Sequence, residues 1–284
     1  MTDTLASRTN EERIQTTGGL SLFVRSWRPP GTARAAVVIC HGVNSHSGYY
    51  EWAGEQLAAA GLAVYALDLR GRGKSDGERF YISSIGEYIA DVDAVVELAR
   101  GREPGLPVFL LGHSAGGVVS CVYTLEHGEK LAGLICESFA FQVAAPDFAL
   151  AVVKGLSHIA PHAHVLKLPK EEFSRDPEVV AAMNADPLTA HEVQPTSTVA
   201  ELVRADERLK REFPSIKLPV LILHGTADTV TNPKGSQFFF DTAGSADKTL
   251  KLYEGHVHDL LNDYGREEVM ADITGWLDAR LASS

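Results

Sequence analysis

Short apolar runs rich in valine, isoleucine and leucine recur along the chain and alternate with stretches that have a helical period. The runs are continuous rather than alternating in polarity, which is typical of parallel strands buried on both faces of a sheet. They are Ala35 to Cys40, Ala63 to Leu67, Val108 to Leu111, Leu131 to Cys136, Val220 to Leu223 and Thr249 to Tyr253. A further run, Leu20 to Trp27, precedes two prolines and predicts an antiparallel leading strand.

Three amphipathic stretches between these runs predict helices, namely Glu51 to Ala60, Ile85 to Arg100 and Gly117 to His127. Each is followed directly by a glycine, which we expect to take the left-handed conformation that ends a helix. The alternation of strands and helices predicts a doubly wound, mostly parallel α/β sheet. The first 17 residues carry charges throughout and have no apolar run of signal-peptide length, so we expect a frayed N-terminus.

The alternation stops between Phe139 and Pro214 and resumes at Leu218. An insertion at this point would lie over the carboxyl ends of the strands, where open α/β sheets bind ligands. The predicted organisation is therefore one α/β core, residues 1–138 and 215–284, with a cap or lid formed by residues 139–214.

Composition narrows the class of protein. Hydrophobic residues make up 45% and charged residues 22% of 284 residues, as in soluble globular proteins. The net charge of −11 disfavours a nucleic-acid partner, because phosphates would be repelled. Cys40, Cys121 and Cys136 form no CxxC pair, which favours core thiols in a reducing compartment and a cytoplasmic protein. The charge-free stretch Pro107 to Leu125 is interrupted by glycines and a histidine, so it predicts a buried strand that turns into a helix rather than a membrane span.

The strongest chemical signal is Gly112-His-Ser114-Ala-Gly116, which follows a predicted strand and opens a predicted helix. This context is that of a nucleophile elbow, a tight turn that exposes a serine hydroxyl at the top of a sheet. Side chains two residues to either side of the serine would collide in such a turn, which explains both glycines. We therefore predict that Ser114 is a nucleophile.

A serine nucleophile needs a base and an orienting acid, which follow it in the chain order serine, acid, histidine. Asp228 lies just after the strand that ends near Leu223, and His258 lies after the next strand. His256 is the competing histidine, but it sits within the turn, whereas His258 directly precedes an apolar helix start. The alternative acids are interpreted as helix-end or surface charges; they are Asp241, Asp259 and Asp263.

An oxyanion hole needs two backbone N–H groups near the nucleophile. We assign them to Ala115, which follows the serine, and to Val43, in the loop after the strand Ala35 to Cys40. His41 at the start of that loop is interpreted as a structural hydrogen-bonding residue rather than a base.

Two other motifs are interpreted as structural. The basic run around Gly71-Arg72-Gly73 lacks the first glycine of a phosphate-binding loop, so we expect a tight turn. His158, His162 and His164 have no carboxylate or cysteine at ligand spacing, so no metal is predicted there, and no cofactor is required anywhere.

From about Gly19 to Leu277 the chain resembles the monoacylglycerol lipase and lysophospholipase-like branch of the serine α/β-hydrolases. The segments that carry the resemblance are HGVNSHSGYY, DLRGRGKSDGER, GHSAGG, FSRDPEVVAAMNADPL, HGTADTV and YEGHVHDLLND. It implies an α/β-hydrolase fold with a helical cap inserted after the sixth strand, and it assigns Ser114, Asp228 and His258 to the catalytic triad. The chain departs from similar proteins in three places, with Asn44-Ser45 in place of Gly-Glu, Ala115 in place of methionine, and Arg72 in place of the histidine of Gly-His-Gly.

Together with the resemblance, these observations predict a serine ester hydrolase for monoacylglycerols, lysolipids or other esters with one medium or long acyl chain. Apolar residues of the cap are candidates for the acyl-binding wall, although they could equally pack on the core; they are Phe139, Phe141, Phe148, Leu150 and Val153. The same triad could cleave amides, with Glu171, Glu172 or Asp176 holding a substrate amine, and the fold also serves as a ligand receptor. A transient contact of the cap with a membrane surface stays open, as does the oligomeric state.

Overall fold

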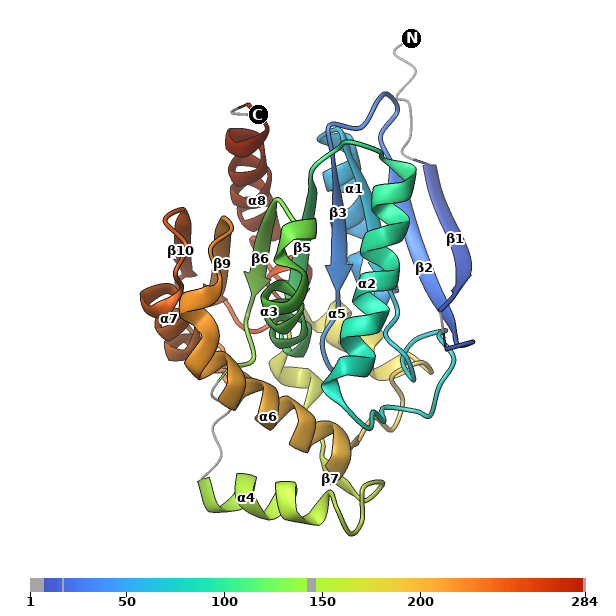
Figure 1. The fold of residues 1–284 in the computed structure, drawn as a ribbon, viewed down its shortest axis with the longest axis vertical. Coiled ribbons are helices and arrows are strands. Elements are labelled where there is room, and N and C mark those ends of the chain that lie inside the picture. Colours follow the sequence, from blue (N-terminus) through green and yellow to red (C-terminus); the bar gives the residue numbers. More distant parts are fainter. Residues whose placement is uncertain (1–7, 17, 142–146, 283–284) are drawn as a thin grey trace.

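The protein is built around an eight-stranded sheet with the order β1-β2-β4-β3-β5-β6-β9-β10 (Figure 1). The computed structural model describes residues 8–16, 18–141 and 147–282, and for Arg8 and residues 147–149 it describes the backbone alone. Strands β1, β2 and β4 pair antiparallel, and the pairs from β4 to β10 are parallel. The prediction of a mostly parallel α/β sheet is confirmed.

Every predicted strand is present, with ends that differ from the prediction by at most two residues. The strands of the large sheet are β1 Arg8–Gln15, β2 Ser21–Arg28, β3 Ala35–Cys40, β4 Leu62–Leu67, β5 Val108–His113, β6 Gly133–Glu137, β9 Val220–Gly225 and β10 Lys248–Tyr253. Strands β3 to β6 and β9 are buried along their whole length, as continuous apolar runs require.

The prediction of a frayed N-terminus is wrong for residues 8–15, which form the edge strand β1. Its polar sequence gives no apolar signal because its described side chains, residues 9–15, are all exposed or half-buried. The strand is held by its antiparallel pairing with β2 and by ion pairs of Glu11 with Arg25, Glu12 with Arg102 and Arg13 with Asp76. Charges on an edge strand also discourage pairing with another chain.

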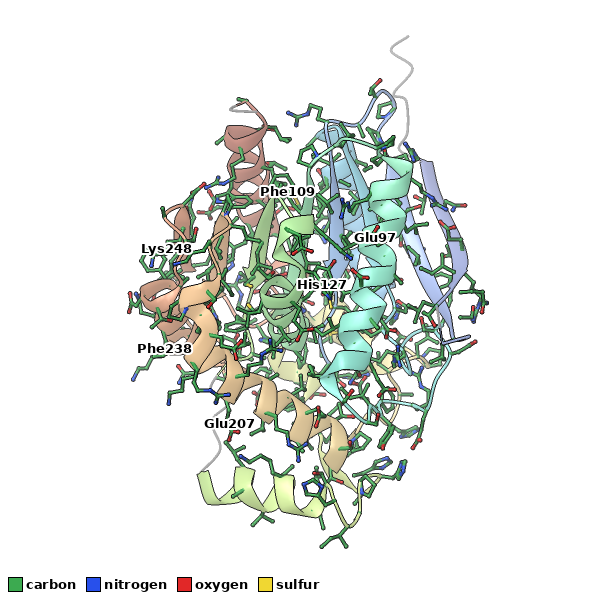
Figure 2. The ribbon with its side chains drawn as sticks, viewed as in Figure 1. Glu97, Phe109, His127, Glu207, Phe238 and Lys248 are labelled. Carbon is green, nitrogen blue, oxygen red and sulfur yellow. The ribbon has the colours of Figure 1, made fainter. Side chains whose placement is uncertain are left out.

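Helices cover both faces of the sheet. The eight α-helices of the described chain are α1 Glu51–Ala59, α2 Ile85–Arg102, α3 Ala115–His127, α4 Asp147–Leu156, α5 Pro177–Ala185, α6 Thr196–Glu212, α7 Pro233–Thr242 and α8 Arg266–Leu281. Helices α1 and α8 share one buried apolar cluster with the sheet. Phe109 of β5, labelled in Figure 2, belongs to this cluster and packs edge-to-face with Trp276 of α8 at 5.9 Å between ring centroids. Helices α2, α3, α6 and α7 share the cluster on the opposite face.

Of the three predicted glycine caps, one is confirmed. Gly61 after α1 has a φ of +86°, the left-handed conformation. Gly101 instead lies inside α2, which continues to Arg102, and Gly128 has a φ of −59° and starts a short 3-10 helix, Gly128–Lys130. The N-terminus of α2 is clearly defined, because Ser84 and Glu87 form a reciprocal capping box.

An insertion separates β6 from β9 and contains α4, α5, α6 and the two-stranded sheet of β7 His164–Leu166 and β8 Gln194–Pro195. It lies at the lower end of the molecule in Figure 1, the end to which the arrow of β3 points. Glu207 on α6, labelled in Figure 2, pairs with Lys154 of α4. Among the described residues, no helix is both long enough and apolar enough to cross a membrane.

Candidate active site

Ser114 occupies a strained turn between β5 and α3. Its φ of +55° and ψ of −123° lie outside the regions that side chains normally favour, and it is almost completely buried. A Cβ added at Gly112 would lie 2.6 Å from the Gly116 carbonyl oxygen, and one added at Gly116 would lie 2.2 Å from the Cys40 carbonyl oxygen. The two glycines therefore permit the close packing of the turn on itself and on the end of β3.

A continuous hydrogen-bonded chain links Ser114, His258 and Asp228. The His258 Nε2 atom lies 3.0 Å from the Ser114 Oγ atom, and its Nδ1–H donates to Asp228 Oδ2 at 2.8 Å. All three residues are buried, and they come from loops that follow β5, β9 and β10. His256, the competing histidine, is instead half-buried, and its ring is tilted against that of Tyr253 at 5.5 Å between centroids.

Asp228 accepts more hydrogen bonds than a triad acid alone would need. Its Oδ1 atom accepts from the backbone N–H groups of Val230 and Thr231, at 2.8 and 2.9 Å. Its Oδ2 atom accepts from the Thr231 hydroxyl at 2.7 Å and from His224 Nε2 at 3.0 Å, in addition to His258. Burial by itself would raise the pKa of Asp228, but the hydrogen bonds from His224 and His258 hold it well below its ordinary value. The carboxylate is thus ionised and rigidly oriented.

The sequence analysis did not identify His224 as a hydrogen-bond partner of Asp228. The available signal was its place directly after the apolar residues of β9, because polar residues at the carboxyl ends of parallel strands gather at one edge of the sheet.

The loop after β3 packs directly on Ser114. A Cβ at Gly42 would lie 2.8 Å from the Ser114 Cβ atom, so the loop backbone passes beside Ser114. His41 Nδ1–H donates to the Gly42 carbonyl at 2.7 Å, while His41 Nε2 accepts from the Leu69 N–H at 3.1 Å. Burial lowers the pKa of His41 to about 4, so the ring is neutral. The prediction that His41 shapes this loop is confirmed.

A second group of buried titratable residues lies behind His258. One ligand-type atom from each of His113, Glu137 and Asp259 lies within 4.8 Å of the others. The His113 ring centroid is 5.0 Å from that of His258. Burial raises the pKa of Asp259 to about 6 and the pKa of Glu137 well above its ordinary value.

The interpretation of Asp259 and Asp263 as surface charges is wrong, whereas their expected place at helix ends is confirmed, because they flank the short 3-10 helix Leu260–Asn262. Both carboxylates are buried, and Asp263 binds the Arg175 guanidinium at 2.7 Å. The segment of the insertion that carries Arg175 packs on this loop, a contact that local sequence cannot reveal. Asp241 is exposed and accepts from Gln237, as expected of a surface charge.

Phe139 and Phe141 do not form an open wall. Their rings stack at 5.5 Å between centroids and pack against Phe213, with both side chains almost completely buried in the core. The sequence left open that these residues pack on the core, and this is what they do. Both come soon after β6, and their side chains turn inward beneath α6 and α7. Leu150 and Val153 on α4 are half-buried, and the side chain of Phe148 lies outside the described residues.

The remaining motifs have structural partners. Around Gly71 and Gly73, which have positive φ, the Lys74 N–H donates to Asp68 Oδ2 at 2.7 Å. The Asp68 carboxylate thus accepts a backbone N–H of this turn, which agrees with the prediction of a structural turn rather than a phosphate-binding loop. In the insertion, the His162 Nδ1 atom lies 2.7 Å from Glu78 Oε1, and the His162 ring stacks on Tyr81.

The acids proposed for an amine-binding site have other partners. Glu171 accepts from Asn184, Glu172 from the Thr229 hydroxyl, and Asp176 caps the N-terminus of α5.

Comparisons with known proteins agree with this architecture. Residues 31–265 match the family described as serine aminopeptidase, S33. The chain is 32% identical over 279 residues to the monoacylglycerol lipase of Mycolicibacterium smegmatis, which covers 98% of this chain and 100% of that protein. The chain belongs to the monoacylglycerol lipase branch of the serine α/β-hydrolases. Human monoglyceride lipase is 34% identical over 271 residues, 94% of this chain and 89% of that protein.

Among solved structures, the monoacylglycerol lipase of Paleococcus ferrophilus aligns with a TM-score of 0.81 at 31% identity, over 96% of this chain and 99% of that chain. The family and the α/β-hydrolase fold predicted from the sequence are thereby confirmed, and the chain is a serine hydrolase.

Proposed function

We propose that this protein hydrolyses monoacylglycerols and related acyl esters through an acyl-enzyme formed on Ser114. The observation that carries the proposal is the hydrogen-bonded chain from Ser114 Oγ through His258 to Asp228 at the carboxyl ends of the strands. The lipase names of relatives that align over nearly the whole chain favour ester over amide substrates.

In the acylation step, Ser114 Oγ attacks the ester carbonyl carbon while its proton moves to His258 Nε2. Asp228 accepts the Nδ1–H of His258 and stabilises the positive charge that develops on the imidazole. His258 then gives the proton to the departing alcohol oxygen, and the ester C–O bond breaks. Water repeats the sequence on the acyl-enzyme, which releases the fatty acid and restores Ser114.

The negative oxygen of the tetrahedral intermediate would be stabilised by the backbone N–H groups of Val43 and Ala115. Among the described residues, neither N–H is taken up by a hydrogen bond, and the Val43 loop lies against Ser114. Both donors are therefore available for the substrate.

We assign residues 139–214 to a cap over the site, with Leu150 and Val153 of α4 toward the acyl chain. Val152 and Ile159 of the cap are exposed by 62% and 84%, and Val165 by 41%. Exposed apolar side chains gathered on one end favour a transient contact with a lipid surface that supplies the substrate. The free, buried cysteines favour a cytoplasmic location.

The decisive experiment measures hydrolysis of p-nitrophenyl esters from acetate to palmitate, and of a monoacylglycerol, by wild type, Ser114→Ala and Ser120→Ala. Ser120 is a buried serine of α3 that is not part of the hydrogen-bonded chain, so it is a matched control. We expect turnover by wild type and Ser120→Ala, and a loss of at least about 10³-fold in Ser114→Ala. The chain length with the highest kcat/KM would measure the acyl site.

An aminoacyl p-nitroanilide tests the rival activity. Turnover of the anilide without turnover of any ester would overturn the ester-hydrolase proposal in favour of an aminopeptidase. Absence of turnover on both substrate classes would favour a ligand receptor.

A further inference from the structure

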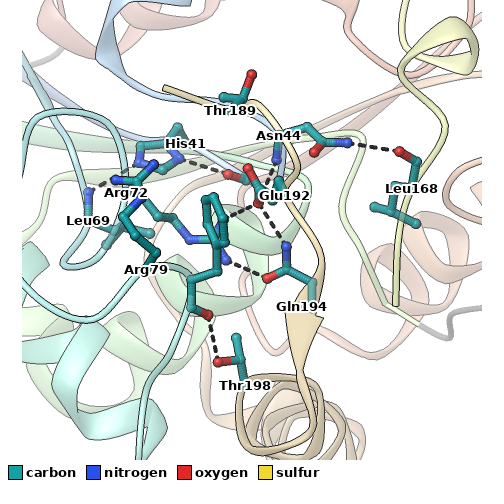
Figure 3. A network of polar contacts seen from close by, with 12 residues as sticks. His41, Asn44, Leu69, Arg72, Arg79, Leu168, Thr189, Glu192, Gln194 and Thr198 are labelled. Atoms are coloured by element: carbon teal, nitrogen blue, oxygen red, sulfur yellow. Dashed lines mark hydrogen bonds and ion pairs between the residues drawn. The ribbon is translucent and has the colours of Figure 1, made fainter. Parts of the chain in front are cut away.

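A buried ion pair joins the cap to the turn after β4. Arg72 and Glu192 are exposed by only 2% and 4%, and the Arg72 Nη1 atom pairs with Glu192 Oε1 (Figure 3). Gln194 completes the group, since its Oε1 atom accepts from Arg72 Nη2 at 2.7 Å and its Nε2 atom donates to Glu192 at 2.8 Å. Taking two charges out of water is costly, and here hydrogen bonds to both charged groups offset that cost.

The same Glu192 oxygen reaches the loop beside the nucleophile. The Asn44 N–H donates to Glu192 Oε1 at 3.0 Å, across 148 residues of sequence (Figure 3). Asn44 has a φ of +55°, and its side-chain Nδ2 donates to the Leu168 carbonyl at 3.1 Å. An ionised acceptor makes the stronger kind of hydrogen bond, which stabilises this uncommon backbone conformation.

These contacts hold both peptide groups that flank Val43. The Gly42 carbonyl, which shares a peptide plane with the Val43 N–H, accepts from His41. The Asn44 N–H, which shares a plane with the Val43 carbonyl, donates to Glu192. Because each peptide group is planar, the His41 bond sets the direction of the Val43 N–H. The Glu192 bond fixes the next peptide plane and so limits the backbone rotation at Val43 that would tilt this N–H.

We propose that Glu192 is a positioning residue that, with Arg72 as its buried counter-charge, aims the Val43 N–H at the oxyanion. The inference rests on the proposed function, because it assigns the cap a part in the same acyl-transfer step. Residues Thr189 to Pro195 would then belong to the catalytic framework rather than only to a lid. Loss of the acceptor would lower kcat and leave ground-state binding of the ester almost unchanged.

The test compares two double variants that both lack the ion pair. Arg72→Met/Glu192→Gln keeps an oxygen that can accept from the Asn44 N–H, whereas Arg72→Met/Glu192→Leu has the same bulk and no acceptor. Replacing both charges avoids leaving one of them buried and unpaired. Rates are expressed per active serine, titrated with a p-nitrophenyl phosphonate, so that partly unfolded protein does not enter the comparison.

We expect the glutamine double variant to stay within about threefold of wild-type kcat. For the leucine double variant we expect kcat to fall by about 10- to 100-fold with KM changed less than about threefold, somewhat less than the loss of a whole oxyanion donor. The inhibition constant of an alkylboronic acid, whose tetrahedral adduct places an oxygen in the oxyanion hole, should rise in parallel with the loss of kcat. A purely structural role would not single out kcat and the boronic acid in this way.

Equal kcat values for the two double variants, or a boronic acid constant that does not change, would overturn the inference. If Arg72→Met/Glu192→Leu yields no titratable serine, Arg72→Leu/Glu192→Met is the second acceptor-free pair for the same comparison. A wild type without ester turnover would instead refute the proposed function, so the two failures are distinguishable.

Discussion

At the scale of single residues, the site depends on how completely Asp228 is surrounded by donors. Two backbone N–H groups, a hydroxyl and two imidazoles converge on its two oxygens. Such a carboxylate favours the His258 tautomer with Nδ1–H toward the acid, which in the proposed mechanism leaves Nε2 to accept the Ser114 proton.

Replacing Asp228 by asparagine should therefore lower kcat by about 10⁴-fold, because an amide can donate its NH₂ group to His258 Nδ1 and so favour the wrong tautomer. Steady-state hydrolysis of p-nitrophenyl butyrate checks the effect. Asp241→Asn, at an exposed position on α7, is the control and should retain wild-type kcat. A comparable loss in both variants, or less than tenfold in Asp228→Asn, would remove Asp228 from the triad.

The buried carboxyl groups Glu137 and Asp259 lead to a pH-dependent prediction. Their folded-state pKa values are raised by burial, so between about pH 4 and those values the folded protein binds more protons than the unfolded chain. The free energy of unfolding must then fall as the pH rises through this window. The neighbouring His113 and His258 belong to the same buried group.

Glu137→Gln removes one of these carboxyl groups and keeps an oxygen that can accept from the Leu261 N–H, as Glu137 does. We expect it to raise the free energy of unfolding by about 1–3 kcal/mol at pH 8 and to change it little at pH 4. Denaturant titrations at both pH values measure this difference, with the exposed Glu254→Gln as control. An effect of equal size at both pH values would show that charge burial is not its cause.

At the scale of the elements, the end of β3 and the first turn of α3 approach so closely that only glycine fits between them. A Cβ at Gly116 would meet backbone oxygens of both Cys40 and His41, at 2.2 and 2.4 Å, and neither can move aside as a side chain could. Gly101 in α2 is the opposite case, since a Cβ there meets nothing within 4 Å.

Gly116→Ala should therefore lower the free energy of unfolding by about 2–3 kcal/mol. Gly101→Ala should raise it by about 0.5–1 kcal/mol, because alanine loses less backbone freedom in a helix. Paired denaturation curves of the two variants measure both signs. Destabilisation by Gly101→Ala would contradict the continuation of α2 through this residue.

At the scale of the whole molecule, the insertion brings an apolar surface to the end of the sheet that carries the site. Val152 and Ile159 lie on this end, while Leu252 is an exposed apolar residue of the edge strand β10. The net charge of −11 favours neutral over anionic lipid surfaces for any such contact.

Val152→Asp/Ile159→Asp should reduce hydrolysis of a long-chain monoacylglycerol in phosphatidylcholine vesicles by about tenfold or more. The reason is that burying each apolar side chain in the lipid surface would contribute about 1.5–3 kcal/mol to binding. Turnover of water-soluble p-nitrophenyl acetate should stay within about twofold. Vesicle flotation measures binding directly, and Leu252→Asp is the matched control. If Leu252→Asp has the same effect on vesicle substrate, the cap is not the contacting surface.

The sequence by itself determined the strands of the parallel sheet, the turn at Ser114 and the order of Ser114, Asp228 and His258. These features follow from short-range patterns, because a strand buried on both faces must be apolar throughout and a tight turn must have glycine. The triad candidates could be found in the same way, since the loops after successive parallel strands meet at one edge of the sheet.

Only the tertiary structure decided features that depend on partners far away in the chain. The polar strand β1 exists through its pairing with β2, and Phe139 and Phe141 enter the core because Phe213 is there to receive them. The burial of Asp259 and the bond from Asn44 to Glu192 have the same origin. No local pattern encodes such contacts, because the free energy of burying a polar or aromatic side chain depends on which residues the fold brings against it.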